Sequence, residues 1–309
     1  MQRKKRPVTV ILLIFLAATP LFSVDVENDP GWLIFEKGKQ LFDSGEYGDA
    51  IYYFRKAYEK LGSSPEIEYW IGRVFEAEGE YTLAEKQYET SIDQRKLLLV
   101  PDEEIELRTR LAQVCRTLND FDGYSSGLEA ITAYDTARRN EQAVYEIDPL
   151  TLTRVLVERG YDKLLELYRI DDYGGLSAYY NLGIYKYRTG FYAASIQQLT
   201  FAFVITNTTV INYMIDRDPE YRFATLPDLL FDALRFPRVF DYLYTVDAFG
   251  QAYALGTALY ATGEVTKQAV AKELWRIIIE YDENGWWTAK ARRQLQSPFD
   301  DDFMIIFPE

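Results

Sequence analysis

The chain has 309 residues, of which 48% are hydrophobic, 27% charged and 16% aromatic, a composition typical of a globular protein rather than a disordered one. There is no histidine, which excludes Ser-His and Cys-His nucleophile pairs and imidazole metal sites. The single cysteine, Cys115, excludes an intramolecular disulfide and Cys-rich zinc or iron–sulfur sites. The formal net charge of −14 disfavours nucleic acids and anionic membranes as partners.

The N-terminus has the pattern of a secretory signal peptide. Four basic residues over 3–6 precede an apolar run over 8–18 that is short for a membrane-spanning helix. We expect residues 1–23 to be a signal peptide cleaved near Ser23, and residues 24–30 to be a linker. The mature chain, with 30 basic and 48 acidic residues, then carries a net charge of −18.

This pattern predicts a periplasmic location. In the alternative, the N-terminal segment is not cleaved and anchors the chain in the inner membrane, facing the periplasm. We expect contact with a membrane only in that second case.

A repeat follows the linker. The segment 31–57 matches a second copy 34 residues later without a gap, so that Gly38 aligns with Gly72 and Gly45 with Gly79. Apolar residues recur at threes and fours, and the second glycine stands where a helix must end in a left-handed residue. Each copy therefore predicts a helix, a turn and a second amphipathic helix, with the first glycine allowing the two helices to approach closely.

A 34-residue unit with small and aromatic residues at these positions resembles the tetratricopeptide repeat family, in its exported bacterial form. The resemblance implies an all-α fold, a right-handed α-solenoid of tetratricopeptide-like helix pairs with a C-terminal capping helix. Three further copies share the small residue and the turn residue, at Ala112 and Asn119, Gly183 and Gly190, and Gly256 and Gly263.

We divide the repeats into an N-terminal set over 31–140 and a C-terminal set over 141–296. The last three copies are spaced by 71 and 73 residues, close to twice 34, so we expect a degenerate helix pair in each gap. The first pair is expected over 149–170 with its turn at Gly160. The second gap contains an irregular insert near 207–245, which three prolines interrupt.

The end of the chain differs from the repeats. Residues 286–296 predict a capping helix, with apolar residues at intervals of four and two arginines directed outward. Residues 297–309 form a tail that is acidic and then apolar. We expect the tail either to fold back on the solenoid or to dock into a partner.

In the tetratricopeptide family the first helix of each pair lines the concave surface, so the resemblance assigns groove-facing positions by their offset from the small residue. Aromatic residues recur at these positions together with a few arginines, which suits the capture of an extended peptide or a partner helix. In the alternative, the tyrosines fill helix interfaces, and 25 tyrosines are enough for both roles. The predicted partner-binding residues are Phe35, Tyr69, Arg73, Arg116, Tyr180, Tyr187, Tyr253 and Tyr260.

The function expected from these features is that of a non-catalytic, exported scaffold or adaptor that holds a partner protein or peptide in a tyrosine-lined concave groove. The corresponding assembly lies in the cell envelope and is of outer-membrane, cell-wall or periplasmic flagellar-motor type. A self-assembling homo-oligomer and a small-ligand binding protein are alternatives. So is a glycan hydrolase that uses two carboxylates, with Glu76, Glu78 and Glu80 as candidates by position. We expect no cofactor, no metal and a structural role for Cys115.

Overall fold

A computed structural model describes residues 26–142, 147–282 and 285–298. The described residues form fourteen α-helices and one short 3-10 helix, with no strand among them, so the predicted all-α class is confirmed. The segment 1–23, expected to be a signal peptide, and the end of the tail, 299–309, lie outside the described residues. The helices are α1 Gly31–Asp43, α2 Tyr47–Leu61, α3 Pro65–Ala77, α4 Tyr81–Asp93, η1 Arg95–Leu97, α5 Glu103–Thr117, α6 Phe121–Gln142, α7 Pro149–Leu167, α8 Leu176–Arg188, α9 Tyr192–Arg217, α10 Leu226–Ala233, α11 Pro237–Thr245, α12 Ala248–Ala261, α13 Val265–Tyr281 and α14 Trp286–Gln296.

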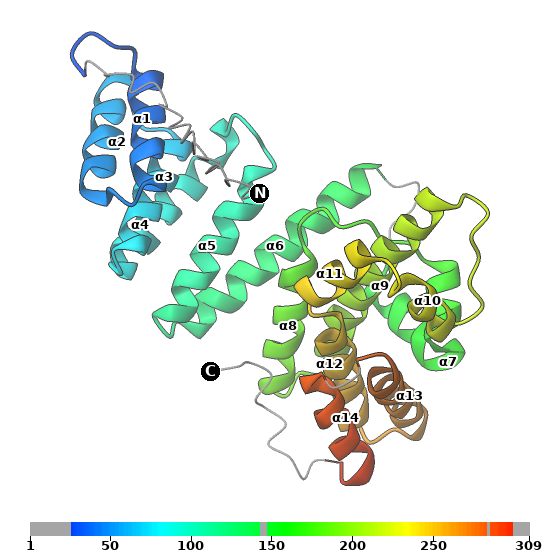
Figure 1. Cartoon of the computed structure of the whole chain (residues 1–309). Helices are drawn as coiled ribbons and strands as arrows, with labels where there is room; N and C mark the ends of the chain where they lie inside the picture. Colours follow the sequence, from blue (N-terminus) through cyan, green and yellow to red (C-terminus); the bar gives the residue numbers. More distant parts are fainter. Residues whose placement is uncertain (1–25, 143–146, 283–284, 299–309) are drawn as a thin grey trace, which may run out of the picture.

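Five helix hairpins form a solenoid-like stack: α1 with α2, α3 with α4, α5 with α6, α8 with α9, and α12 with α13. The second helix of each hairpin packs against the first helix of the next, including α6 on α8 and α9 on α12, and α14 covers α13 at the end of the stack. Figure 1 shows α1 to α4 at one end of the molecule, α7 to α14 at the other, and α5 and α6 between them. These repeated hairpins agree with the tetratricopeptide-like fold expected from the sequence.

Each hairpin turns through one residue in the left-handed region. Gly45, Gly79, Asn119, Gly190 and Gly263 have φ between 62° and 82°. In the first four hairpins the N–H of the residue after the turn donates to the carbonyl five positions earlier, as Glu46 does to Leu41 at 2.9 Å. This hydrogen bond pairs a carbonyl group that the end of the first helix would otherwise leave free. Glycine takes this conformation without steric cost, and asparagine tolerates it better than most residues. The predicted turn positions are therefore confirmed.

The small residues inside the hairpins are required by packing. A Cβ atom at Gly38 would lie 2.6 Å from the ring of Phe54, and one at Gly183 would lie 2.5 Å from Cγ of Leu199. Gly72 faces Tyr88 and Gly256 faces Trp275 in the same way. In the α5–α6 hairpin the roles are exchanged, because Ala112 stands on the first helix and Gly127 faces it from the second.

The segments between the later repeats lie outside the stack. Helix α7 breaks at Gly160, whose φ is 81°, so the predicted turn there is confirmed. However, α7 packs against α9 and α13, while α6 and α8 contact each other directly. Each gap therefore contains a pair of helices, as expected: the two parts of α7 in the first, and α10 and α11 in the second. Neither pair is inserted in the stack, because α6 contacts α8 and α9 contacts α12 directly.

The predicted insert near 207–245 begins later than expected. Helix α9 continues through Arg217, so the first part of that range is regular helix. Asn207, Val210, Ile211 and Met214 are all buried on this extension, because α7 packs on it. The rest of the range contains the two short helices α10 and α11, each with a proline at its start. The capping helix matches its predicted range, 286–296.

None of the helices in the described part of the chain is both long and apolar enough to span a membrane.

Replacing Gly183 with alanine tests the close approach within a hairpin. We expect Gly183→Ala to lower the free energy of unfolding by about 1–3 kcal/mol, because the added methyl group overlaps Leu199. The matched control is Gly48→Ala, also within a helix but with no atom within 4 Å of the added Cβ, which should stabilise by about 1 kcal/mol or less. Urea unfolding followed by circular dichroism measures both values. Equal effects of the two substitutions would contradict the packing argument.

Candidate functional site

Helices α1 and α3 carry a surface of stacked aromatic rings and cations. The ring of Trp70 lies 5.3 Å from that of Phe42 and 5.8 Å from that of Tyr69. The guanidinium of Arg73 lies 5.0 Å from the centre of the Phe42 ring and 5.4 Å from that of Trp70. Spacings of three and four residues along each helix bring these side chains to one side. We call this surface, which consists of Phe35, Lys39, Phe42, Tyr69, Trp70 and Arg73, the aromatic face.

Cations hold the rings of the aromatic face in place. The Lys39 ammonium lies 5.7 Å from the ring centres of both Phe35 and Trp70, so it links α1 to α3. Contacts of this kind are worth about 0.5–1 kcal/mol each at exposed sites and more where water is excluded. The face is therefore organised before any partner arrives, which reduces the entropy lost on binding.

A polar network extends the aromatic face to α5. Arg73 donates to the hydroxyl of Tyr69 at 3.1 Å, and that hydroxyl donates to Glu106 at 3.3 Å. Glu106 pairs with Arg110 at 2.9 Å, and Arg110 also reaches Glu76 at 3.5 Å. Burial raises the pKa of Tyr69, so its hydroxyl stays protonated and remains a donor at neutral pH.

A pocket of about 240 Å³ opens beside this network, between α3, α5 and the segment after α4. Its lining includes the aromatic rings of Tyr69 and Trp70 and the apolar side chains of Leu98 and Leu107. Three carboxylates, from Glu66, Glu103 and Glu106, also line this α3–α5 pocket, with Lys39 as the single cation.

An exposed apolar loop adjoins the α3–α5 pocket. Leu97 is 66% exposed and Leu99 is 86% exposed. The N–H of Leu99 donates to Glu66 at 2.8 Å, which ties the loop to α3. Apolar side chains held this far into water next to a pocket are typical of an interaction surface.

The structure brings three of the eight predicted site residues together. Phe35, Tyr69 and Arg73 all belong to the aromatic face. Arg116 is exposed further along α5 and lines a small pocket with Tyr124 on α6 and Asn181 on α8. The sequence interpretation missed Trp70, because its offset from the small residue is not a groove position in the family pattern.

The four tyrosines predicted in the C-terminal repeats fill helix interfaces. Tyr253 is only 1% exposed, and its ring lies 5.2 Å from that of Trp287. Tyr187 is also buried, and the half-buried ring of Tyr260 lies 5.4 Å from that of Trp275. The expectation of an open groove is wrong at Tyr187 and Tyr253, because Tyr253 packs on Trp275 and Trp287, and Tyr187 packs on Tyr192.

Tyr180 belongs to a half-buried polar cluster centred on Asp247, and both residues line a pocket between the segment before α8 and the start of α12. This aspartate starts α12 in the left-handed region, with φ of 53°. Its carboxylate accepts from the hydroxyl of Tyr180 at 3.0 Å and from Nε1 of Trp287 at 2.6 Å. Burial raises the pKa of Asp247. The cluster ties α8, α12 and the capping helix to one another, which is a structural use of Tyr180.

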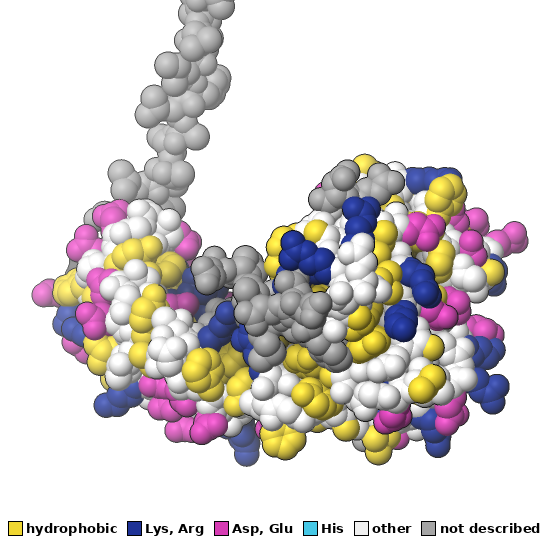
Figure 2. All heavy atoms as spheres, turned by 90° about the horizontal axis from the view of Figure 1, so that it is seen from below, with side chains coloured by type: hydrophobic (Ala, Val, Ile, Leu, Met, Phe, Trp, Pro, Cys, Tyr) yellow, Lys and Arg dark blue, Asp and Glu magenta, His cyan; other side chains and the backbone are white. Residues whose placement is uncertain are grey.

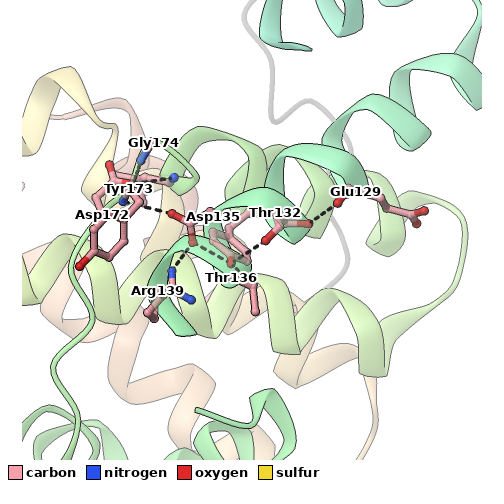
Figure 3. A network of polar contacts seen from close by, with 10 residues as sticks. Glu129, Thr132, Asp135, Thr136, Arg139, Asp172, Tyr173 and Gly174 are labelled. Atoms are coloured by element: carbon pink, nitrogen blue, oxygen red, sulfur yellow. Dashed lines mark hydrogen bonds and ion pairs between the residues drawn. The ribbon is translucent and has the colours of Figure 1, made fainter. Parts of the chain in front are cut away.

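A buried ion pair fixes the joint between α6 and the C-terminal repeats. Asp135 is fully buried and pairs with Arg139 one turn later on α6. The carboxylate also accepts from the hydroxyl of Tyr179 at 3.0 Å and from the N–H of Tyr173 at 3.1 Å. Figure 3 shows these contacts between α6 and the segment that precedes α8. The guanidinium of Arg139 also lies 5.3 Å from the centre of the Phe201 ring on α9.

Cys115 lies between two carboxylates. Its Sγ and one carboxylate oxygen each from Glu85 and Asp120 are all within 4.8 Å of one another, an arrangement of ligand types that can hold a metal ion. Burial, followed by the neighbouring charge of Glu85, raises the pKa of the Cys115 thiol to about 12. The thiol is therefore protonated at neutral pH and chemically inert, which agrees with a structural role.

Comparisons with known proteins assign no activity. No family model matches the chain. It is similar to an uncharacterized protein of Borreliella burgdorferi, with 22% identity over 92% of this chain and 97% of that protein. It is also similar to an uncharacterized protein of Treponema pallidum, with 26% identity over 53% of this chain and 44% of that protein. A solved structure, the C-terminal part of a TPR repeat-containing protein from Cytophaga hutchinsonii, aligns with 15% identity over 83% of this chain and 98% of that chain, at a TM-score of 0.29.

The raised pKa of Cys115 predicts slow alkylation. At pH 8 a thiol with a pKa of about 12 contains about a thousandfold less thiolate than an ordinary cysteine. We therefore expect iodoacetamide to modify the folded chain at least a thousandfold more slowly than the urea-unfolded chain, with the rate still rising tenfold per pH unit at pH 9–10. Mass spectrometry follows the modification. A native rate within tenfold of the unfolded rate would contradict the assignment.

The buried joint predicts a large cost for removing one of its charges. Asp135→Asn leaves the guanidinium of Arg139 buried without its counter-charge, so we expect the free energy of unfolding to fall by about 3–5 kcal/mol. The control is Glu264→Gln, which removes an exposed partner of Lys267 and should change stability by about 0.5 kcal/mol or less. Chemical denaturation measures both. A loss below about 1 kcal/mol for Asp135→Asn would show that the pair does not hold the joint.

Proposed function

We propose that this protein is a non-catalytic interaction scaffold that binds a segment of a partner protein at the aromatic face and the adjoining α3–α5 pocket. The observation that carries the proposal is the pre-arranged set of rings and cations on α1 and α3. These groups lie next to a pocket whose lining includes the rings of Tyr69 and Trp70. Tryptophan, tyrosine and arginine in such surroundings are the residues that contribute most to protein–protein binding.

The chemistry of the α3–α5 pocket indicates the kind of segment that fits it. Its volume of about 240 Å³ suits one long side chain, and its carboxylates outnumber its single lysine. The ammonium of Lys39 already pairs with Glu36 at 3.0 Å. A lysine or arginine flanked by apolar residues therefore complements the pocket, with the apolar residues on Leu97 and Leu99. The net charge of −14 attracts such a basic segment from a distance.

The surroundings of the three candidate catalytic carboxylates, Glu76, Glu78 and Glu80, support a non-catalytic function. Glu76 accepts from the hydroxyl of Tyr88 at 2.5 Å and pairs with Arg110, so it serves the helix interface. Glu78 and Glu80 are exposed beside the turn at Gly79. None of the three lines the α3–α5 pocket.

We further propose that the scaffold works in the cell envelope, in the periplasm or anchored in the inner membrane facing it. The basic and then apolar pattern over 3–18 supports export. Figure 2 shows charged and apolar side chains intermixed on the face that it draws. The assembly that we propose is of outer-membrane, cell-wall or periplasmic flagellar-motor type.

Peptide selection on the purified chain tests the proposed binding site. We expect a phage-displayed library of random heptapeptides to yield sequences with lysine or arginine beside apolar residues. Trp70→Ala removes an aromatic ring from the lining of the pocket, and Glu103→Lys reverses a charge there. Each substitution should therefore weaken the binding of these peptides at least tenfold. Fluorescence anisotropy with labelled peptides gives the dissociation constants.

The matched control is Leu83→Ala, which truncates an exposed apolar side chain on α4 outside the pocket and should leave binding unchanged. Circular dichroism establishes that each variant keeps its helices. Selected peptides without basic residues, or binding that ignores both pocket variants, would overturn the proposal. Capture of a second copy of this chain through the same face would favour a self-assembling scaffold instead.

A further inference from the structure

A second, larger pocket lies at the opposite end of the molecule from the aromatic face. It has a volume of about 580 Å³ and is formed by the second half of α7, the C-terminal end of α9 and the segment 221–224. Figure 1 places α7 far from α1 and α3. We call it the α7–α9 pocket. Its volume is in the range of small-molecule sites.

Cations gather in the α7–α9 pocket although the chain as a whole is acidic. Four line it, namely Arg159, Lys163, Arg169 and Arg222, against the two carboxylates of Asp162 and Glu166. Glu166 pairs with Lys163 at 2.8 Å. Asp162 accepts from the N–H of Leu226 at 2.6 Å and so holds the start of α10. Both carboxylates are thus already engaged.

None of the three arginines, all exposed, forms a salt bridge among the described residues, although the charge of Glu166 acts on Arg169. Arg169 donates to the carbonyl of Tyr168 at 3.1 Å, and Arg222 donates to that of Tyr221 at 2.6 Å. Both contacts are with backbone oxygens and carry no compensating charge. Three guanidinium groups without a salt bridge at one pocket, where cations outnumber carboxylates, favour an anionic ligand.

Apolar side chains form the other part of the lining. Ile211 is buried, Ile215 is 37% exposed, and Tyr221 and Phe223 are half-buried. The guanidinium of Arg169 lies 5.8 Å from the centre of the Phe223 ring, so a charged group and an apolar wall meet at this point. A simple inorganic anion would leave that wall in contact with water.

We propose that the α7–α9 pocket binds a small amphiphilic anion, with a carboxylate or phosphate head on Arg169 and Arg222 and an apolar body on Ile215 and Phe223. The planar guanidinium group forms paired hydrogen bonds with either kind of head. Two sources supply this chemistry, a free alkyl carboxylate and an alkyl phosphate monoester. The inference rests on the lining of this pocket and is independent of the function proposed for the aromatic face.

Isothermal titration calorimetry of the full chain with decanoate and with decyl phosphate, below their micelle concentrations, tests the proposal. We expect at least one of the two to bind at least tenfold more tightly than decanol, which lacks the charge, and than inorganic phosphate, which lacks the apolar body. The anion that binds more tightly indicates whether the ligand is an alkyl carboxylate or an alkyl phosphate monoester. Added salt should weaken the binding of the anion.

Variants locate the site. Two variants should each weaken the binding of the anion at least tenfold. The first is the double variant Arg169→Gln, Arg222→Gln, and the second is Ile215→Glu, which places a negative charge in the pocket. The matched control is Arg235→Gln, because Arg235 stacks on Phe231 outside the pocket. If a variant does not fold, the affinities of the unaltered chain for the anions, decanol and inorganic phosphate still test the proposal. Decanol binding as tightly as the anions, no binding of either anion, or affinity unchanged in the folded variants would overturn the proposal.

Discussion

The buried ion pair between Asp135 and Arg139 is the constraint on which the arrangement of the two halves depends. A charge inside a protein is costly unless hydrogen bonds and an opposite charge surround it. Asp135 meets this requirement only when the backbone before α8 and the hydroxyl of Tyr179 are in place. A hydrophobic contact tolerates sliding, whereas this polar contact specifies one position of α8 on α6.

On either side of that joint the fold repeats a simpler rule. One residue without a large side chain lets two helices touch, and one left-handed residue turns the chain back. The result is a stack with the aromatic face at one end and the α7–α9 pocket at the other. The two surfaces have opposite chemistry, since carboxylates predominate in the α3–α5 pocket and guanidinium groups in the α7–α9 pocket. A rigid stack holds two such surfaces at a fixed separation, which is the property expected of a scaffold.

The sequence contains the local rules of this fold but little of its long-range packing. Gly45 and Asn119 mark their turns because the left-handed conformation restricts the residue type, and this restriction is local. Tyr253 occupies the same repeat position as Tyr180 and Tyr69, three residues before the small residue, but its burial depends on α14 and Trp287, which follow later in the chain. The sequence does not predict the α7–α9 pocket, because Arg169 and Arg222 are 53 residues apart and line one pocket only once α7 packs on α9. A repeat pattern therefore predicts which helices pair, and not which of their faces stay open.

The most direct test of a rigid scaffold is the distance between its two halves in solution. Spin labels at Thr82→Cys on α4 and Thr266→Cys on α13, in a Cys115→Ala background, report that distance by pulsed electron paramagnetic resonance. We predict one narrow distance distribution in the otherwise unaltered chain, and a broadened one when Asp135→Asn removes the charge at the joint. A broad distribution in the unaltered chain, or an unchanged narrow one in a folded Asp135→Asn chain, would contradict the account.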